Sequence, residues 1–440
     1  MKGLLILFFS LFVLNQHGQA GPTVPSPETF RLESALDRAY KNNPKLITAQ
    51  KEMMIAKAQV SQAKSLFYPK INLNFNYARY RNETLGVVSP ELGGFILEAP
   101  ITTPDGIRSN PLSENLLLGR VGFQQTLFAG GRIKNTYKLS QANIKRAENA
   151  YETEKKEVRY QTKKHYYTLF ALRQKISVIS SLLEELDTLQ SRNSQQHEAL
   201  AFYQAEVQWQ RKLGELETKE RKALLEFLEV TGLQLFRKVE LDGDLTVPDL
   251  TDDLQSVMTW AKQNRAELKE TLLQAEVDEL SVNLSMAERY PVFKFGGSYE
   301  VRNEKLPLED TNWAAILTMN IPLFDGFSSL ARIRESRYLA QKNRLKRGQL
   351  EDHIEKEVLS AYSDYDHWKG ETQNRQINLN RLEKVQSRYI GKGKKRVGRS
   401  ERIEYLRWLG EAKESLIQGQ FELCLAYNRL ERVVGRRINE

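Results

Sequence analysis

Residues 71–77 read INLNFNY and alternate strictly between large apolar side chains and asparagine. Successive side chains of a β-strand point to opposite faces, so this pattern predicts a strand with one apolar and one polar face. A similar alternation recurs at residues 117–127, 293–301 and 313–321, with Ile316 as an exception in the last stretch. Each stretch has about the 9–11 residues that a tilted strand needs to cross a bilayer. The sequence therefore predicts four amphipathic strands.

These strands have two interpretations. A pair of hairpins packed on helices in a soluble protein would explain any single stretch. Four matched stretches in an exported chain favour strands that span a membrane. Closed barrels begin at about eight strands, and an open sheet edge cannot lie in lipid. If the strands span, several copies of the chain must share one barrel.

The N-terminus has the pattern of an export signal. Lys2 precedes an apolar run at residues 4–14, and a polar stretch ends in Gly18-Gln19-Ala20, a small-x-small pattern. This predicts a signal peptide over residues 1–20, cleaved after Ala20, because the apolar run is too short to span a bilayer. The chain contains a single cysteine, Cys424, which excludes an intrachain disulfide.

Proline is distributed very unevenly. None lies between Pro111 and Pro248, none follows Pro322, and the stretch from Arg132 to Leu213 contains neither proline nor glycine. Because both residues disfavour helix interiors, these regions are predicted to form long helices. A single helix over residues 131–193 would be about 95 Å long at 1.5 Å per residue.

The chain repeats itself. Tyr68-Pro69 and Tyr290-Pro291 each precede a predicted strand and lie 222 residues apart. TLFAGG at 126–131 and PLFDGF at 322–327 follow the second strand of each pair, at an offset of 196. The smaller second offset indicates that the first hairpin loop is 26 residues longer. Each repeat is predicted to run helix, long helix, strand, loop, strand, very long helix, turn, helix.

Two structural repeats follow from this period. The first covers residues 21–233, with strands at about 70–81 and 116–127 and a helical hairpin over 131–232. The second covers residues 234–440, with a linker at 234–252, strands at about 292–302 and 312–322, and a hairpin over 327–435. Proline can end a helix and open a strand, and glycine adopts backbone angles that other residues avoid. The expected strand–helix joints are accordingly Pro69, Gly130, Gly131, Pro291 and Gly326.

Residues of the types used in catalysis, metal binding and nucleic-acid binding are scattered along the chain. The formal net charge is +9, but basic side chains are spread along the chain beside nearly as many acids, which argues against a nucleic-acid partner. The histidines after the signal form no pair at metal-ligand spacing, and no nucleophile motif occurs. We therefore expect no enzyme activity, no catalytic residue, no metal and no cofactor.

The repeated motifs carry a resemblance to a known family. They are LFAGGR at 127–132 with LFDGFS at 323–328, NNPKL at 42–46, and LEVTGL at 228–233 with LERVVG at 430–435. As a set they resemble the outer membrane efflux protein family, the TolC-like exit ducts.

The resemblance implies a mainly α fold with a small β part. Four transmembrane strands per chain would contribute to a shared trimeric β-barrel, continued by a long periplasmic α-helical barrel of coiled-coil hairpins. It implies a homotrimer in outer membrane lipid, with a large periplasmic portion. The partners would be a periplasmic adaptor (membrane fusion protein) and an inner-membrane transporter. The function would be passive export of substrates through a tripartite efflux pump or a type I secretion system.

The stretch GKGKKRVGRS at 391–400 is a near match to a phosphate-binding loop. A helical pattern precedes it where such a loop needs a strand, and Arg399 occupies the lysine position, so we reject a nucleotide site. By the resemblance it is the tip of the second helical hairpin. The resemblance implies a periplasmic gate at Glu401 and Glu404, with Arg399 and Arg402 as inter-chain partners. It also implies an adaptor-contacting tip formed by Lys392, Lys394, Lys395, Arg396 and Gly398.

Two other classes of protein compete with this interpretation. An exported enzyme on a helical scaffold is disfavoured because the sequence has no catalytic constellation. A periplasmic coiled-coil adaptor or structural protein without a membrane barrel would also be exported and rich in long helices. It would need β-rich domains flanking one hairpin in place of duplicated amphipathic strand pairs. The nature of the cargo, whether drug, metal ion, metabolite or protein, stays open at this level.

Overall fold

The computed structural model describes residues 28–79, 102–103, 106–107, 115–189, 196–235, 237–303, 308, 310–390 and 398–438. The expected signal peptide and four of the expected tip residues, Lys392, Lys394, Lys395 and Arg396, lie outside these ranges. The chain divides into two compact units that each draw on both sequence repeats. Unit 1 comprises residues 1–43, 159–247 and 368–425, and unit 2 comprises residues 44–158, 248–367 and 426–440.

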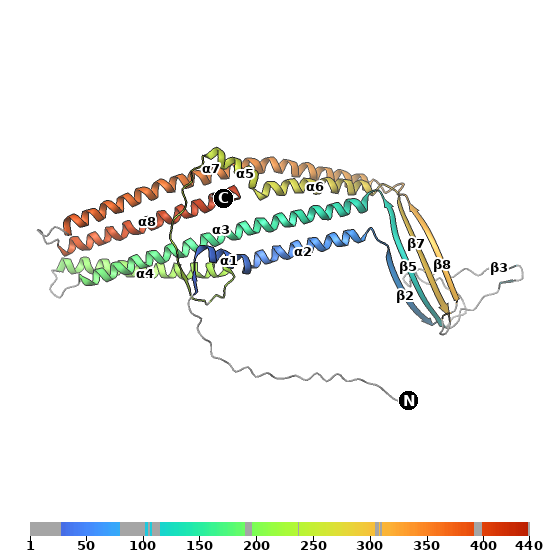
Figure 1. Cartoon of the computed structure of the whole chain (residues 1–440), viewed down its shortest axis with the longest axis horizontal. Coiled ribbons are helices and arrows are strands. Elements are labelled where there is room, and N and C mark those ends of the chain that lie inside the picture. Colours follow the sequence, from blue (N-terminus) through green and yellow to red (C-terminus); the bar gives the residue numbers. More distant parts are fainter. Residues whose placement is uncertain are drawn as a thin grey trace, which may run out of the picture. The chain divides into compact units, whose positions relative to one another are not determined.

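Long helices dominate the described chain (Figure 1). Their bounds are α1 Leu32–Asn42, α2 Pro44–Ser65, α3 Arg132–Thr188, α4 Gln196–Thr231, α5 Leu254–Asn264, α6 Ala266–Ala287, α7 Ser328–Ile390 and α8 Arg399–Val434. Helices α3 and α7, with 57 and 63 residues, are the long helices that the absence of proline predicted.

The strands of unit 2 form one antiparallel sheet in the order β2-β5-β7-β8. Their bounds are β2 Lys70–Arg79, β5 Asn115–Ala129, β7 Val292–Asn303 and β8 Asp310–Asn320. These are the four strands that alternation predicted. The central pair β5–β7 joins the two sequence repeats, and β2 and β8 are the edges. A short pair, β3 Thr102–Thr103 with β4 Gly106–Ile107, lies between β2 and β5 in the chain.

Unit 1 has its own apolar core. Buried aromatic residues of α3 and α4, among them Tyr166 and Phe227, pack around Phe30 of strand β1 (Glu28–Phe30). Strand β1 pairs in parallel with β6 (Val239–Leu241), which brings the N-terminal segment against the chain that follows α4. The Tyr166 hydroxyl donates to the carbonyl of Asp242 at 2.9 Å, and burial raises the pKa of Tyr166 to about 12.

The internal repeat is visible in matched contacts. In unit 1, Gly232 has a φ of +66° and lies so close to Asn42 that an added Cβ would stand 2.5 Å from its carbonyl oxygen. In unit 2, Gly435 has a φ of +78°, and a Cβ there would stand 2.7 Å from the carbonyl oxygen of Asn264. Asn42 and Asn264 occupy equivalent positions 222 residues apart. Glycine is required at both because the backbone is left-handed and the neighbouring chain is close.

Candidate functional site

The apolar face of the sheet is continuous across all four strands. The register places Leu73, Val121, Tyr299 and Trp313 in one row of directly paired residues. The neighbouring rows on this face carry Phe75, Phe123, Phe295 and Leu317. Leu73 and Trp313 are each 75% exposed. An apolar surface of this extent on a soluble monomer marks a site that another apolar phase covers.

The opposite face of the same sheet is polar. The adjoining row contains Asn74, Arg120, Glu300 and Asn312. Arg120 forms an ion pair with Glu300 at 3.0 Å, and its Nη2 donates to the Ser298 hydroxyl at 3.3 Å. Asparagine, threonine and charged side chains make up most of this face, with Leu118 and Ile316 as exceptions, so it is suited to contact with water. The sheet thus separates an apolar surface from a polar one over a single layer.

A bulge ends this regular pattern near the helices. The pairing between β5 and β7 shifts between Thr126 and Phe128, so Phe128 lies opposite Phe293. Their rings meet edge to face with centroids 6.1 Å apart. Alternation counted from Phe123 would assign Phe128 to the polar face, and the bulge moves it to the apolar one because an extra residue is accommodated there. Sequence periodicity carries no signal for this extra residue.

The structure places the five expected joint residues between strands and helices. Pro69 and Pro291 directly precede β2 and β7, and Gly130 and Gly131 connect β5 to α3. Gly130 has a φ of +60°, and a Cβ there would lie 2.5 Å from the Cβ of Tyr290. Gly326 also has a positive φ, +64°, but a Cβ at that position would meet no described atom within 4 Å.

The expected gate residues lie in the first turns of α8. Gly398 precedes this helix, and its backbone N–H donates to Oε2 of Glu401 at 3.3 Å, as in a capping box. Glu401 and Glu404 are exposed on one helix face, one turn apart, while Ile403 and Leu406 are buried on the other. Glu401 therefore has a capping role within its own chain, whatever else it does.

Acidic residues of two other helices lie close to the start of α8, and the sequence did not point to them. Arg402, expected as an inter-chain partner, forms an ion pair with Glu185 of α3 in its own chain at 3.6 Å. Burial raises the pKa of Tyr405, and the charges of Glu383 and Glu185 raise it further. Because Glu185 and Glu383 come from α3 and α7, only the packing of the helices brings them to the expected gate.

Further polar contacts attach α8 to the first hairpin. Lys212 of α4 forms an ion pair with Glu414, and Lys175 of α3 hydrogen-bonds to Gln418. Burial lowers the pKa of Lys175. The negative charge of Glu414 opposes this shift, and the positive charge of Lys212 adds to it. These contacts lie away from the tip along α8, so this helix is held to α3 and α4 by both apolar and charged groups.

Within the described residues, no group of three or more His, Cys, Asp or Glu side chains is placed to hold a metal ion. None of the described helices combines the length and the apolar character required to cross a bilayer. Cys424 is buried, and burial raises the pKa of its thiol to about 12, which keeps it protonated and unreactive.

Residues 35–216 match the family described as "Outer membrane efflux protein". This match supports the predicted resemblance over that part of the chain, and the fold is the expected TolC-like architecture of mainly α structure with a small sheet. A search of curated protein sequences returned no significant match.

Several solved outer membrane channels share the fold. The CmeC outer membrane channel of Campylobacter jejuni is 13% identical, with 92% of this chain and 85% of that chain covered and a TM-score of 0.72. The outer membrane protein VceC of Vibrio cholerae is 13% identical, with 92% and 96% covered and a TM-score of 0.70. The MtrE outer membrane channel of Neisseria gonorrhoeae, solved in an open state, is 14% identical, with 93% and 89% covered and a TM-score of 0.69.

Proposed function

We propose that this chain is one subunit of an outer-membrane exit duct that passively conducts substrates out of the cell. The observation that carries the proposal is the two-faced sheet. Its apolar face is exposed across all four strands, and its other face is lined with asparagine, threonine and charged groups. An apolar face toward lipid and a polar face toward water are what a transmembrane β-barrel wall requires.

The sheet edges support a shared barrel. Strands β2 and β8 are paired on one side only within the described sheet. Because the sheet has four antiparallel strands, β8 of one chain and β2 of the next would also run antiparallel, so identical chains can continue the sheet around a ring. Three chains, the number that the family resemblance implies, would supply twelve strands, enough to close a barrel with a water-filled interior.

The helical part would serve the periplasmic section of the duct. We propose that the helical hairpins form an α-barrel whose tips meet a periplasmic adaptor, with an inner-membrane transporter supplying the substrate. The duct itself then needs no catalytic group. The signal peptide would be cleaved after Ala20 during export, which N-terminal sequencing of the mature protein tests by a start at Gly21.

The lipid-facing assignment is tested by a pair of neighbouring substitutions. Leu73→Lys places a charge on the apolar face, and Asn74→Lys places the same charge on the polar face of the same strand. A lysine on the lipid side costs about 2–4 kcal/mol at the bilayer midplane, whereas one in the lumen is tolerated. We expect Leu73→Lys to lower the amount of trimer in the outer-membrane fraction several-fold, with Asn74→Lys near the native amount.

The opposite ranking of these two variants would reverse the assignment of the faces. A native chain recovered as a soluble monomer from the periplasmic fraction would favour the adaptor or structural protein and overturn the duct.

We also propose that Glu401 and Glu404 contribute to the periplasmic gate. Both are exposed in the first turns of α8, beside Arg402 and its partner Glu185. Replacing both by alanine should change single-channel conductance and lower cation preference in planar bilayers, because two negative charges per chain are lost. Glu411→Ala, an exposed acid further along α8, is the matched control. Unchanged conductance and ion preference in the double variant would remove these residues from the gate.

A further inference from the structure

The polar face of the sheet carries an excess of positive charge. Among the strand residues whose side chains the structure describes, the charged groups on this face are Lys70 of β2, Arg120 of β5, and Lys294 and Glu300 of β7. The apolar face of the same described stretches carries no charged side chain. The charges are therefore sorted to one face, where basic groups outnumber the acidic one.

The acidic side chain of this face is already neutralised within the chain. Glu300 forms an ion pair with Arg120 at 3.0 Å, and their side chains are only 24% and 33% exposed. Arg120 also donates to the Ser298 hydroxyl at 3.3 Å, which helps to hold its guanidinium beside Glu300. This row of the sheet is thus electrically neutral, and the positive charge that remains comes from the two lysines.

Lys70 and Lys294 stand on either side of strand β5. Lys70 lies opposite Gln124 and Lys294 lies opposite Thr126, two residues further along β5. Two strand spacings and two residue rises place the lysine Cα atoms about 12 Å apart. Both lysines are exposed, and within the described part of the chain neither forms an ion pair. Each chain therefore presents two unneutralised ammonium groups on its polar face.

These lysines lie at the end of the sheet where the strands meet the helices of unit 2 (Figure 1). Lys70 is the first residue of β2, and Lys294 is the third residue of β7. In a barrel shared by identical chains, every copy would add its two lysines at the same level of the interior. A pore lined by charge of one sign and surrounded by lipid focuses its field on the water inside, so it concentrates ions of the opposite sign.

We propose that the polar face of the sheet forms an anion-selective section of the duct, in which Lys70 and Lys294 attract anionic solutes. The favoured cargo then carries carboxylate or phosphate groups. This inference rests on the proposed function, because the polar face can select among solutes only where it lines water. It adds the charge class of the cargo, which the assignment of a duct leaves open.

The chemistry of the two lysines suits a passage for anions. A wet face needs no charge, as the row of Asn72, Asn74 and Asn76 on β2 shows, so the lysines add a property beyond wetting. A lysine ammonium has three N–H donors on a flexible stem and does not demand one fixed geometry from carboxylate or phosphate oxygens. Such a group attracts an anion and also lets it leave, as conduction requires.

Ion selectivity of the full-length trimer in planar bilayers tests the proposal. Under a potassium chloride gradient, the reversal potential gives the ratio of chloride to potassium permeability. We expect Lys294→Gln to lower this ratio about threefold, because one positive charge per chain is lost from the pore wall. Lys70→Gln should act in the same direction and add to it, whereas Lys294→Arg keeps the charge and should retain the native ratio. An unchanged ratio in the double glutamine variant would overturn the proposal.

A charge-balanced pair of substitutions is the first control. Arg120→Gln combined with Glu300→Gln removes one positive and one negative group from the same face, so the net charge of the face is kept. We expect a permeability ratio close to that of the native trimer. A fall as large as that of Lys294→Gln would show that the ratio does not follow the net charge of this face, and would contradict the proposal.

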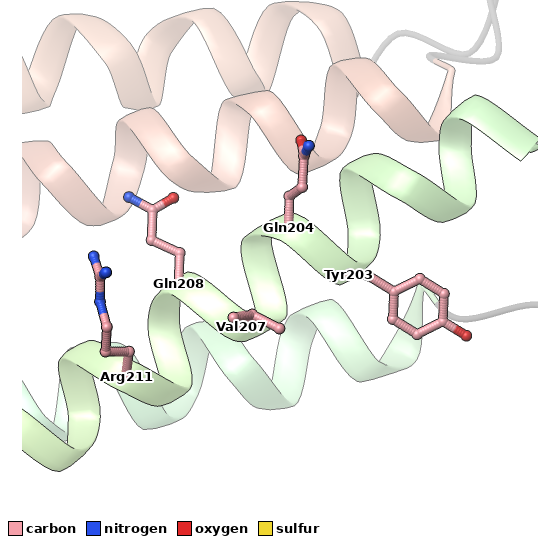
Figure 2. A pocket seen from close by; sticks show the side chains of 5 residues that line it. All are labelled: Tyr203, Gln204, Val207, Gln208 and Arg211. Carbon is pink, nitrogen blue, oxygen red and sulfur yellow. The ribbon is translucent and has the colours of Figure 1, made fainter.

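Arg211 of α4 provides a second control outside the sheet. Figure 2 shows this residue on a helix of unit 1, where it lines a hollow of about 410 Å³ together with Tyr203, Gln204, Val207 and Gln208. Arg211→Gln removes the same charge from the chain as Lys294→Gln but leaves the sheet unchanged. The permeability ratio should stay native, and an equal fall in the two variants would overturn the assignment of selectivity to the sheet.

A multivalent anion tests the class of cargo. Citrate, which carries three carboxylates, should block the potassium chloride current of the native trimer. We expect its half-blocking concentration to rise about tenfold in the variant with Lys70→Gln and Lys294→Gln. Spermidine, a trivalent cation, should block the native trimer no more strongly than this variant. Equal citrate block of the two proteins would overturn the proposal.

Failure of this inference and failure of the duct give different results. A trimer that conducts, with a permeability ratio and a citrate block that do not depend on the lysines, retains the duct and loses the anion-selective section. A chain that forms no channel in bilayers loses both. The lysine variants are also separable from the gate variant, because loss of Glu401 and Glu404 should raise the chloride to potassium ratio and loss of the lysines should lower it.

Discussion

The two repeats build the same joint with different side chains. In the first repeat, the side-chain amide of Asn43 donates to the Val230 carbonyl at 2.8 Å. At the equivalent position of the second repeat, Arg265 donates to the Val433 carbonyl at 3.0 Å and also pairs with Glu357 at 2.7 Å. Both donors satisfy a carbonyl in the last turn of a long helix, where intrahelical partners run out. The repeat therefore preserves the geometry of the contact and varies its chemistry.

The closing glycines should show the largest effect. Gly232→Ala and Gly435→Ala each force a left-handed backbone on an L-residue, at about 1–2 kcal/mol, and also push a Cβ against a neighbouring carbonyl. We expect each to lower the free energy of unfolding by about 3 kcal/mol, measured by denaturant titration followed by circular dichroism. Gly326→Ala, with a similar φ and open space around it, is the control and should cost only about 1 kcal/mol. If Gly435→Ala lowered the free energy of unfolding no more than the control does, the two joints would not be equivalent.

The two side chains that donate to these carbonyls, Asn43 and Arg265, should contribute different amounts to the free energy of unfolding. Asn43→Ala removes one hydrogen bond and should cost about 1 kcal/mol. Arg265→Ala also leaves Glu357, about one-third exposed, with only its contact to His353, so we expect about 2 kcal/mol. Arg265→Asn transplants the side chain of the first repeat, and recovery of part of this loss would show that the joints are interchangeable. Equal losses for the two alanine variants would mean that the Glu357 pair contributes nothing.

The smallest expected effect is a pH dependence confined to the first repeat. His165 contacts Glu226 at 3.2 Å, while the equivalent position of the second repeat holds Ala361. Burial lowers the pKa of His165 below 6.5, with Glu226 partly opposing the shift. The unfolded chain therefore binds the proton more readily, and stability falls as the pH drops from about 6.5 through the lowered pKa of the folded state.

His165→Gln should reduce the fall in melting temperature between pH 7.5 and 5.0 by a small but reproducible amount. An identical pH dependence in native protein and His165→Gln would show that this histidine does not contribute.

Much of the architecture was predictable because its signals are local. Alternation at 71–77 predicted β2, and the absence of proline and glycine after Gly131 predicted α3. Gly130 has the left-handed backbone that was expected of a glycine between a strand and a helix. Pro69 and Pro291 stand directly before strands, where a residue without an N–H group is tolerated. Each of these features depends on neighbours a few residues away, which the sequence displays directly.

Only the tertiary structure decided which distant groups meet. The pairing of β5 with β7 across the repeats, the ion pair of Arg402 with Glu185, and the clash that excludes a side chain at Gly232 all join residues more than 150 positions apart in the chain. The position of Phe128 on the apolar face likewise follows from a bulge set by the partner strand. Such contacts depend on how whole helices and strands pack, and periodicity along one segment does not contain that information.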